Sequence, residues 1–99
     1  MNFFFNFFFI LFFIFSYHSF CQPNFLSKNK KANKLYYEGV SFSKIGEFEL
    51  ALGKYNKSIK SDPNFALPYI NLGEIYKKRG NYSKAINVFR NVLNNKLNY

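Results

Sequence analysis

The chain has 99 residues, and 14 Lys and Arg against 5 Asp and Glu give it a formal charge of +9 at neutral pH. This length allows one small domain. A single His and a single Cys cannot supply a His/Cys metal cage or an internal disulfide. We therefore expect no metal, no cofactor and no enzymatic activity.

Residues 1–21 form an apolar N-terminal segment. Ten of the 15 Phe residues lie before Cys21, and the apolar run over residues 3–15 is interrupted only by Asn6. An apolar stretch of about 7–15 residues that ends near small residues is typical of a secretory signal peptide, whereas a membrane-spanning helix needs about 20. The small residues Ser19 and Cys21 predict cleavage after Cys21, and hence an exported protein, periplasmic or secreted.

The charges around this segment favour a retained membrane anchor instead. No Lys or Arg precedes the apolar run, whereas four lysines follow it, namely Lys28, Lys30, Lys31 and Lys34. Under the positive-inside bias, an uncleaved segment would keep the C-terminal part in the cytoplasm. An ordinary buried helix is a third interpretation. Lipid attachment at Cys21 is disfavoured because the bulky Phe20 precedes it.

Residues 22–31 are polar and basic and show no apolar periodicity, so they predict a linker. We interpret its KNKK run as a solvated tether. A patch that binds anionic lipid or nucleic acid is the alternative.

From Ala32 onward the sequence repeats itself at a spacing of 34 residues, so that 32–65 align with 66–99. The identical pairs are Ala32 with Ala66, Gly39 with Gly73, Lys44 with Lys78, Gly46 with Gly80, Ala51 with Ala85 and Asn64 with Asn98. Large apolar and aromatic residues also recur in register, for example Phe42 with Tyr76, Phe48 with Tyr82, Leu52 with Ile86 and Tyr55 with Phe89. A fixed period of this length predicts a repeat architecture.

The first repeat is predicted to form two antiparallel helices. Leu35, Phe42 and Ile45 mark the apolar stripe of the first helix. Gly39 lies on the same side, and a glycine inside a helix suggests that another backbone approaches closely there. Gly46 is expected to end this helix with a positive φ angle.

The second helix should begin near Glu47 or Phe48 and end at Asp62 and Pro63, because proline cannot continue a helix. Its inner face is predicted to carry Phe48, Ala51, Leu52, Tyr55 and Ile59.

The second repeat is predicted to copy this hairpin. Asn64 should cap its first helix, with Pro68 in the first turn, and Gly80 and Asn81 should form the connecting turn. The two apolar stripes are predicted to consist of Leu72, Gly73, Ile75 and Tyr76, and of Tyr82, Ala85, Ile86, Phe89 and Leu93. The sequence thus predicts an all-α fold of two stacked antiparallel helical hairpins after the apolar segment.

This pattern resembles the tetratricopeptide repeat. The family's order of large apolar residue, Leu-Gly, aromatic, Gly-x-aromatic, Ala, aromatic and Pro is matched by Leu35, Gly39, Phe42, Gly46, Phe48, Ala51, Tyr55 and Pro63. It returns as Tyr69, Leu72, Gly73, Tyr76, Gly80, Tyr82, Ala85 and Phe89. Two residues depart from it, because Glu38 replaces the Leu of the first repeat and Leu97 the closing Pro of the second.

The resemblance implies a protein-binding scaffold, an α-solenoid fragment whose concave groove receives an extended peptide or a partner helix. Carried over residue by residue, the groove positions are Asn33, Tyr36, Tyr37, Val40, Ser43 and Lys44, followed by Leu67, Ile70, Asn71, Glu74, Lys77 and Lys78. Lys44, Lys77 and Lys78 predict an acidic or carboxylate-bearing partner, unless they are ordinary solvated lysines. Tyr36 and Tyr37 either contact the partner or pack against the linker.

The last helix is more apolar than its counterpart, because Val88 replaces Lys54 and Val92 replaces Ser58. Stacked repeats need neighbours to bury a continuous core. We therefore expect residues 82–95 to be covered, by a second copy of the chain through Val88 and Val92, by another protein or by further repeats.

Three other functions compete with the scaffold hypothesis. The basic charge with tyrosines would suit a nucleic-acid-binding helical repeat, but the Lys and Arg residues are dispersed along all four helices. An enzyme is disfavoured because His18 lies in the N-terminal segment and the carboxylates are expected on turns and outer faces. A membrane-anchored assembly factor facing the cytoplasm would differ only in the fate of residues 1–21.

Overall fold

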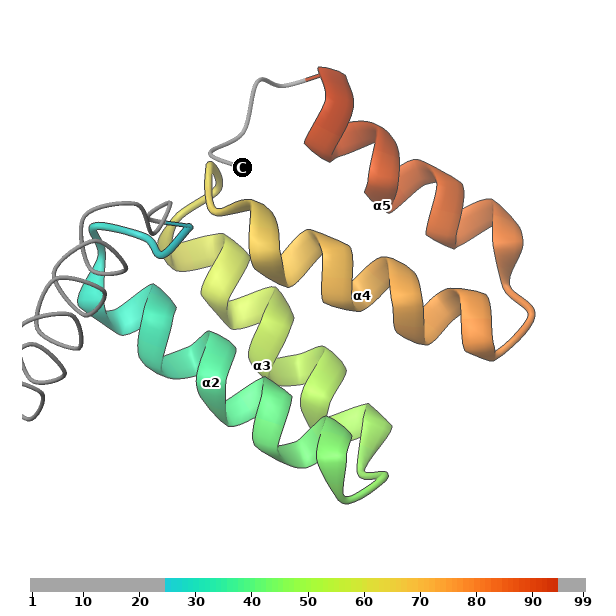
Figure 1. Cartoon of the computed structure of the whole chain (residues 1–99), viewed down its shortest axis with the longest axis horizontal. Coiled ribbons are helices and arrows are strands. Elements are labelled where there is room, and N and C mark those ends of the chain that lie inside the picture. Colours follow the sequence, from blue (N-terminus) through green and yellow to red (C-terminus); the bar gives the residue numbers. More distant parts are fainter. Residues whose placement is uncertain (1–24, 95–99) are drawn as a thin grey trace, which may run out of the picture.

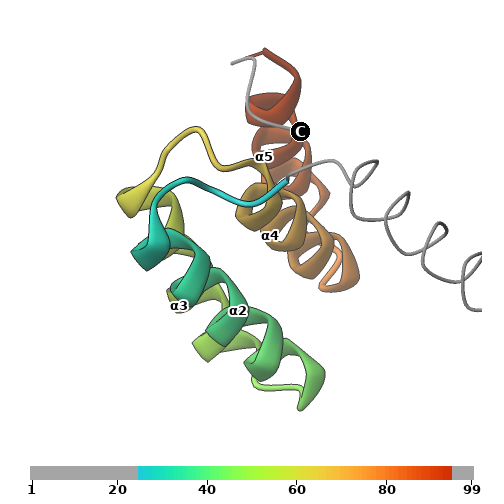
Figure 2. The same cartoon turned by 60° about the vertical axis from the view of Figure 1, so that its left-hand side comes forward.

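The computed structural model describes residues 25–94 and contains four helices in that range. They are α2 (Lys30–Lys44), α3 (Phe48–Ser61), α4 (Ala66–Lys78) and α5 (Tyr82–Asn94). Helix α2 packs on α3, α3 on α4 and α4 on α5, so neighbours in the chain are also neighbours in space (Figure 1). Figure 2 shows the α2–α3 and α4–α5 hairpins as two layers. The predicted all-α fold of stacked helical hairpins is confirmed.

The predictions for residues 1–21 and for Leu97 lie outside the described residues. None of the helices between residues 25 and 94 is long and apolar enough to cross a membrane. Helix α2 begins at Lys30, inside the range 22–31 that the sequence predicts to be a linker.

The residues just before α2 are fixed to the end of α3. The side chain of Asn29 accepts a hydrogen bond from the Ala32 amide at 3.0 Å and so caps α2. Its own amide group donates to the Ser61 carbonyl at 3.0 Å. The hydroxyl of Ser27, a buried residue, donates to the Asp62 carboxylate. This part of the expected tether is therefore an ordered cap on the first hairpin.

Glycines with positive φ angles close both hairpins, as the sequence predicts. The φ angle is 79° at Gly46 and 76° at Gly80. In each turn the next residue donates its amide to a carbonyl five residues back, Glu47 to Phe42 and Asn81 to Tyr76, both at 2.9 Å. This bond satisfies a carbonyl at the helix end that would otherwise lack a partner.

Two predicted roles at helix ends are wrong. Ile45 was expected in the inner stripe of α2, but its side chain is 71% exposed because it lies at the C-cap, where the chain already turns away. Asn64 was expected to cap α4, but Phe65 occupies the N-cap and no side chain caps this helix. The backbone amide of Asn64 donates instead to the Asp62 carboxylate at 3.1 Å.

The core lies where α3 meets α4. It consists of the buried residues Ala51, Leu52, Tyr55, Leu72 and Ile75. Ser58, which is also buried, donates its hydroxyl to the Ala32 carbonyl at 2.7 Å and so ties α3 to α2. The small residues Ala51 and Ala85 are buried, in line with the sequence prediction.

The atoms nearest to the glycines inside α2 and α4 belong to aromatic rings, whereas the sequence suggested a backbone. A Cβ atom added to Gly39 would lie 2.5 Å from the ring of Tyr55 in α3. A Cβ atom at Gly73 would collide in the same way with the ring of Phe89 in α5. In each hairpin, therefore, an aromatic ring of the second helix lies against a glycine of the first.

Glu38 forms an ion pair that the sequence pattern does not predict. Its carboxylate pairs with the Lys54 ammonium at 2.7 Å, across the α2–α3 interface. The hydrogen bond from Lys54 lowers the pKa of the Glu38 carboxyl. The residue that departs from the repeat pattern thus joins the two helices through charge instead of apolar contact.

The predicted inner face of α5 is only partly buried. Ala85 is buried and Phe89 half-buried, but Tyr82, Ile86 and Leu93 are 63%, 50% and 80% exposed. These three belong to the apolar stripe that the sequence predicts for this helix, but they are exposed within the described residues. Val88 and Val92 are half-buried, and Val88 packs against the core, so self-association through these two valines stays a prediction.

The contact between Gly39 and Tyr55 gives a stability prediction. Gly39→Ala should lower the free energy of unfolding by about 1–3 kcal/mol, because the buried ring has no space to move into. Gly53 lies in α3 with nothing within 4 Å of its added Cβ, so Gly53→Ala should raise stability by about 0.5–1 kcal/mol. Melting of the detergent-solubilised full chain, followed by circular dichroism, measures both. A stabilising Gly39→Ala change would contradict the assigned packing.

Candidate functional site

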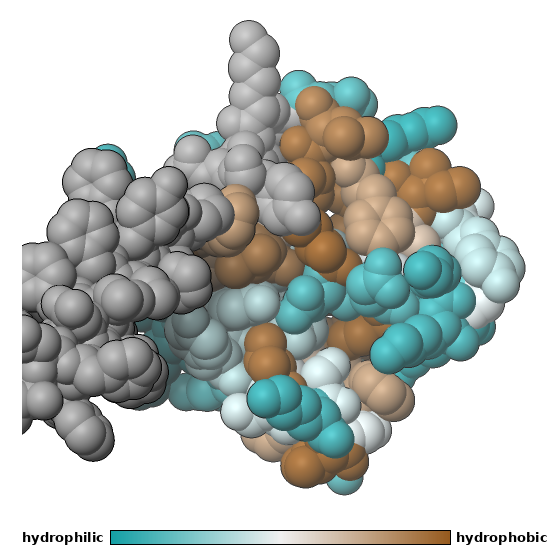
Figure 3. Space-filling model, in the orientation of Figure 1, coloured by the Kyte–Doolittle hydropathy of each residue, from teal (hydrophilic) through white to brown (hydrophobic). Residues whose placement is uncertain are grey.

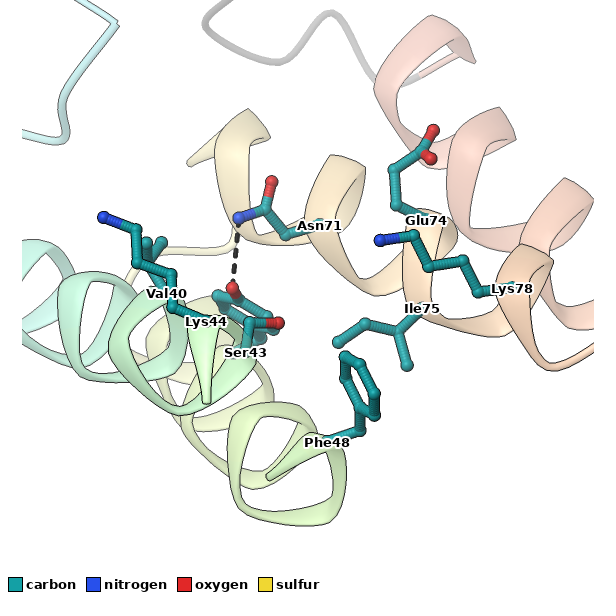
Figure 4. Close-up of a pocket in the computed structure, with 9 residues that line it drawn as sticks. Val40, Ser43, Lys44, Phe48, Asn71, Glu74, Ile75 and Lys78 are labelled. Carbon is teal, nitrogen blue, oxygen red and sulfur yellow. Dashed lines mark hydrogen bonds between the residues drawn. The ribbon is translucent and has the colours of Figure 1, made fainter. Parts of the chain in front are cut away.

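A pocket of about 360 Å³ opens between α2, α3 and α4 (Figure 4). Its lining comes from all three helices: Val40, Ser43 and Lys44 from α2, Phe48 and Tyr55 from α3, and Asn71, Glu74, Ile75 and Lys78 from α4. We call this pocket the groove pocket. It exists because α4 packs on α3 and α5 and makes few contacts with α2, so that a space remains between α2 and α4.

The floor of the groove pocket is apolar. Phe48 at the start of α3 and Ile75 of α4 point toward one another at its base (Figure 4). Val40 adds a third apolar side chain from α2. Such a floor can bury an apolar side chain of a ligand.

A polar contact marks the other side of the groove pocket. The Asn71 side-chain amide donates to the Tyr55 hydroxyl at 3.1 Å, drawn as the dashed line in Figure 4. This bond satisfies the hydroxyl of a buried tyrosine and fixes the orientation of Asn71 at the pocket wall. The carbonyl oxygen of the same amide is then directed away from Tyr55.

Tyr36 packs with core aromatic rings and does not line the groove pocket. Its ring lies 5.4 Å from Phe65 in an edge-to-face arrangement and 6.0 Å from Tyr55, measured between centroids. Burial raises the pKa of the Tyr36 hydroxyl, and a hydrogen bond with Asn71 offsets part of that rise. Tyr37 is exposed and meets Tyr36 edge-on, with centroids 5.3 Å apart.

The charged residues at the groove pocket are mostly lysines. Glu74 pairs with Lys77 at 3.4 Å, and that pair is neutral as a unit. Among the described residues, no ion pair engages Lys44 or Lys78. Two exposed cations on different helices therefore flank an apolar floor, and the local charge favours an anionic ligand.

The structure brings together half of the predicted groove residues. The groove pocket contains Val40, Ser43, Lys44, Asn71, Glu74 and Lys78. Leu67 and Ile70 are half-buried outside its lining. Asn33 also lies outside the lining, and its side chain accepts a hydrogen bond from the Ser27 amide at 2.8 Å and donates one to the Ser27 carbonyl at 2.6 Å.

Sequence reasoning missed Phe48, Tyr55 and Ile75 as pocket residues. It assigned all three to the apolar stripes of their helices, and they do pack in or against the core. The floor of the groove consists of core residues that each leave one side of the side chain accessible to a ligand. The signal available in the sequence is the position of Phe48 directly after the turn, at the first residue of α3, where a side chain can extend into the groove.

A second, basic pocket of about 600 Å³ lies on the first hairpin alone. It is lined by Lys31, Leu35, Lys57, Lys60 and Ser61 and includes no residue of α4. It is therefore separate from the groove pocket. Over residues 25–94 no group of three His, Cys, Asp or Glu side chains is arranged to hold a metal ion.

Residues 54–87 match the family model of the tetratricopeptide repeat. The match extends from the middle of α3, through α4, into α5, and so spans the helices that build the core and one wall of the groove pocket. This part of the chain is similar to a tetratricopeptide repeat. The family indicates a protein–protein interaction scaffold whose repeats are in general not catalytic.

A second comparison finds a relative that matches about half of the chain. The chain is 33% identical over 55 residues to the uncharacterized protein ycf37 of Guillardia theta. The aligned region covers 56% of this chain but only 31% of that protein, so the chain spans about a third of the relative's length. No solved structure matches the chain significantly.

Proposed function

We propose that this protein binds an acidic or carboxylate-bearing segment of a partner protein in the groove pocket. The observation that carries the proposal is the pairing of an apolar floor, Phe48 and Ile75, with two lysines that lack an ion-pair partner in the described part of the chain. An apolar side chain of the ligand would occupy the floor. A neighbouring carboxylate would lie between Lys44 and Lys78.

The structure of the groove pocket favours an extended peptide over a small molecule. The pocket is open along the α2 and α4 sides, and its polar groups come from different turns of these helices. Asn71, held by Tyr55, places a side-chain amide at the pocket wall, where it can bond to the backbone of a peptide. This arrangement suits a chain that runs along the groove and places alternate side chains on the floor.

Charge reversal tests the proposed groove. The probe is a rhodamine-labelled peptide in which Asp and Leu alternate, titrated into the full chain in detergent and followed by fluorescence anisotropy. The double variant Lys44→Glu/Lys78→Glu should weaken binding by about tenfold or more, because two attractions become repulsions.

The matched control is the double variant Lys57→Glu/Lys60→Glu, which changes the net charge equally but alters the basic pocket of the first hairpin. It should leave the affinity within about twofold to threefold, because surface charges beyond a Debye length are screened. A peptide in which Asn and Leu alternate should bind weakly to all variants. Equal weakening by both double variants would contradict a groove-specific site.

We propose further that the chain is exported after cleavage behind Cys21. The support is the apolar run of residues 3–15 together with the small residues Ser19 and Cys21. The scaffold would then act outside the cytoplasm. A retained anchor would make the same scaffold a membrane-tethered assembly factor.

Mass spectrometry of the mature protein distinguishes these two fates. Export predicts a chain that begins at Gln22 and is recovered in the soluble fraction. An intact Met1 in the membrane fraction would contradict cleavage and establish the anchor.

A further inference from the structure

Helix α5 carries an exposed apolar stripe that nothing in the described structure covers. Tyr82, Ile86 and Leu93 recur at spacings of four and seven residues and so lie on one face, with exposed fractions of 63%, 50% and 80%. Figure 3 shows hydrophobic side chains at the surface over the region where Figure 1 draws α5. We call these three residues the α5 stripe. It lies on a different helix from every residue of the groove pocket.

The internal repeat shows what covers such a stripe. A shift of 34 residues relates Tyr82, Ile86 and Leu93 to Phe48, Leu52 and Ile59 of α3. Leu52 is only 8% exposed, because it packs in the core with Leu72 and Ile75 of α4. Phe48 and Ile59 pack against the same cluster. The equivalent face of α3 is therefore covered by α4, an amphipathic helix that places apolar residues against it.

Helix α2 of a second copy does not have the chemistry needed to cover the α5 stripe. The residues of α2 that correspond to Pro68, Leu72 and Ile75 are Lys34, Glu38 and Ser41. Lys34 and Ser41 are exposed, and Glu38 is already paired with Lys54. Burying this polar face against Ile86 and Leu93 would remove the Lys34 charge from water without a partner. A head-to-tail array of copies is therefore disfavoured.

Two copies of α5 are also poorly matched to each other. Helix α5 contains Lys84 and Arg90, both exposed, and no Asp or Glu. Arg90 lies beside the stripe, whereas Lys84 lies on the opposite side of the helix, over the Tyr76 ring of α4. A pair of these helices would bring the two Arg90 side chains together without a carboxylate. The charge instead favours a helix that is neutral or acidic beside its apolar residues.

We propose that the α5 stripe is a docking site for an amphipathic, neutral or acidic helix of another protein. The docked helix would repeat the arrangement of α4, with apolar residues at positions i, i+4 and i+7 that cover Tyr82, Ile86 and Leu93. The scaffold would thus have two contact surfaces, the groove pocket for an extended acidic segment and the α5 stripe for a helix. The second surface does not depend on the first.

A peptide copied from this chain provides the probe. It comprises residues 64–76, which contain Pro68, Leu72 and Ile75 and carry Glu74 as their one charged side chain. A hydrocarbon cross-link between positions 67 and 71 holds it helical, because short helices are marginal in water. The labelled peptide is titrated into the full chain in detergent, and fluorescence anisotropy reports binding.

The matched variants are Ile86→Asn and Leu50→Asn. Ile86 and Leu50 are 50% and 52% exposed, so both substitutions change an apolar surface residue of similar accessibility. Ile86→Asn should weaken peptide binding by about tenfold or more, and Leu50→Asn by less than about twofold. A peptide with Asn in place of Leu72 and Ile75 should not bind the unchanged protein.

Three results would overturn the proposal. The peptide could fail to bind, or Leu50→Asn could weaken binding as much as Ile86→Asn does. The third result would be a dimer of the full chain, detected by sedimentation, that the Ile86→Asn variant does not form and that the peptide does not dissociate. Such a dimer would assign the stripe to a second copy. None of these results bears on the acidic-peptide titration, so failure here is distinguishable from failure of the groove.

Discussion

The packing of an aromatic ring against a glycine is the contact on which the rest of the structure depends. Tyr55 lies over Gly39 in the first hairpin, and Phe89 lies over Gly73 in the second. Each ring is so close that the Cβ atom of an alanine at the glycine position would collide with it. Each glycine costs about 0.5–1 kcal/mol of helix stability relative to alanine. That cost is offset because the ring fills the space and sets how closely the two helices approach.

The same tyrosine connects the core to the candidate site. The ring of Tyr55 fills the space at Gly39, while its hydroxyl accepts a hydrogen bond from Asn71 and lines the groove pocket. Phe48 and Ile75 have a comparable double role, because they pack with the core and form the pocket floor. The groove is therefore as rigid as the hairpins that build it. Its lysines, in contrast, extend from exposed positions and can adjust to a ligand.

The sequence predicts the features that depend on local chemistry or on the period of 34 residues. The positive φ angles of Gly46 and Gly80, the end of α3 at Asp62 and the pairing of helices all follow from these signals. Features that depend on which helix covers which face could not be predicted. Ile86 has the apolarity of its buried counterpart Leu52 but lacks a covering helix, and Asn33 serves the cap at Ser27 instead of the groove. The residue pattern of a helix does not specify which other element packs against it.

Nuclear magnetic resonance of the full chain in detergent, labelled at glycine and the aromatic residues, tests the ring–glycine contacts most directly. The account predicts strong ring-current shifts of the Gly39 and Gly73 α-protons. It also predicts nuclear Overhauser contacts from Gly39 to the ring protons of Tyr55 and from Gly73 to those of Phe89. Helical carbon shifts without these contacts, and with glycine protons at ordinary positions, would contradict the interlocked hairpins and the groove built upon them.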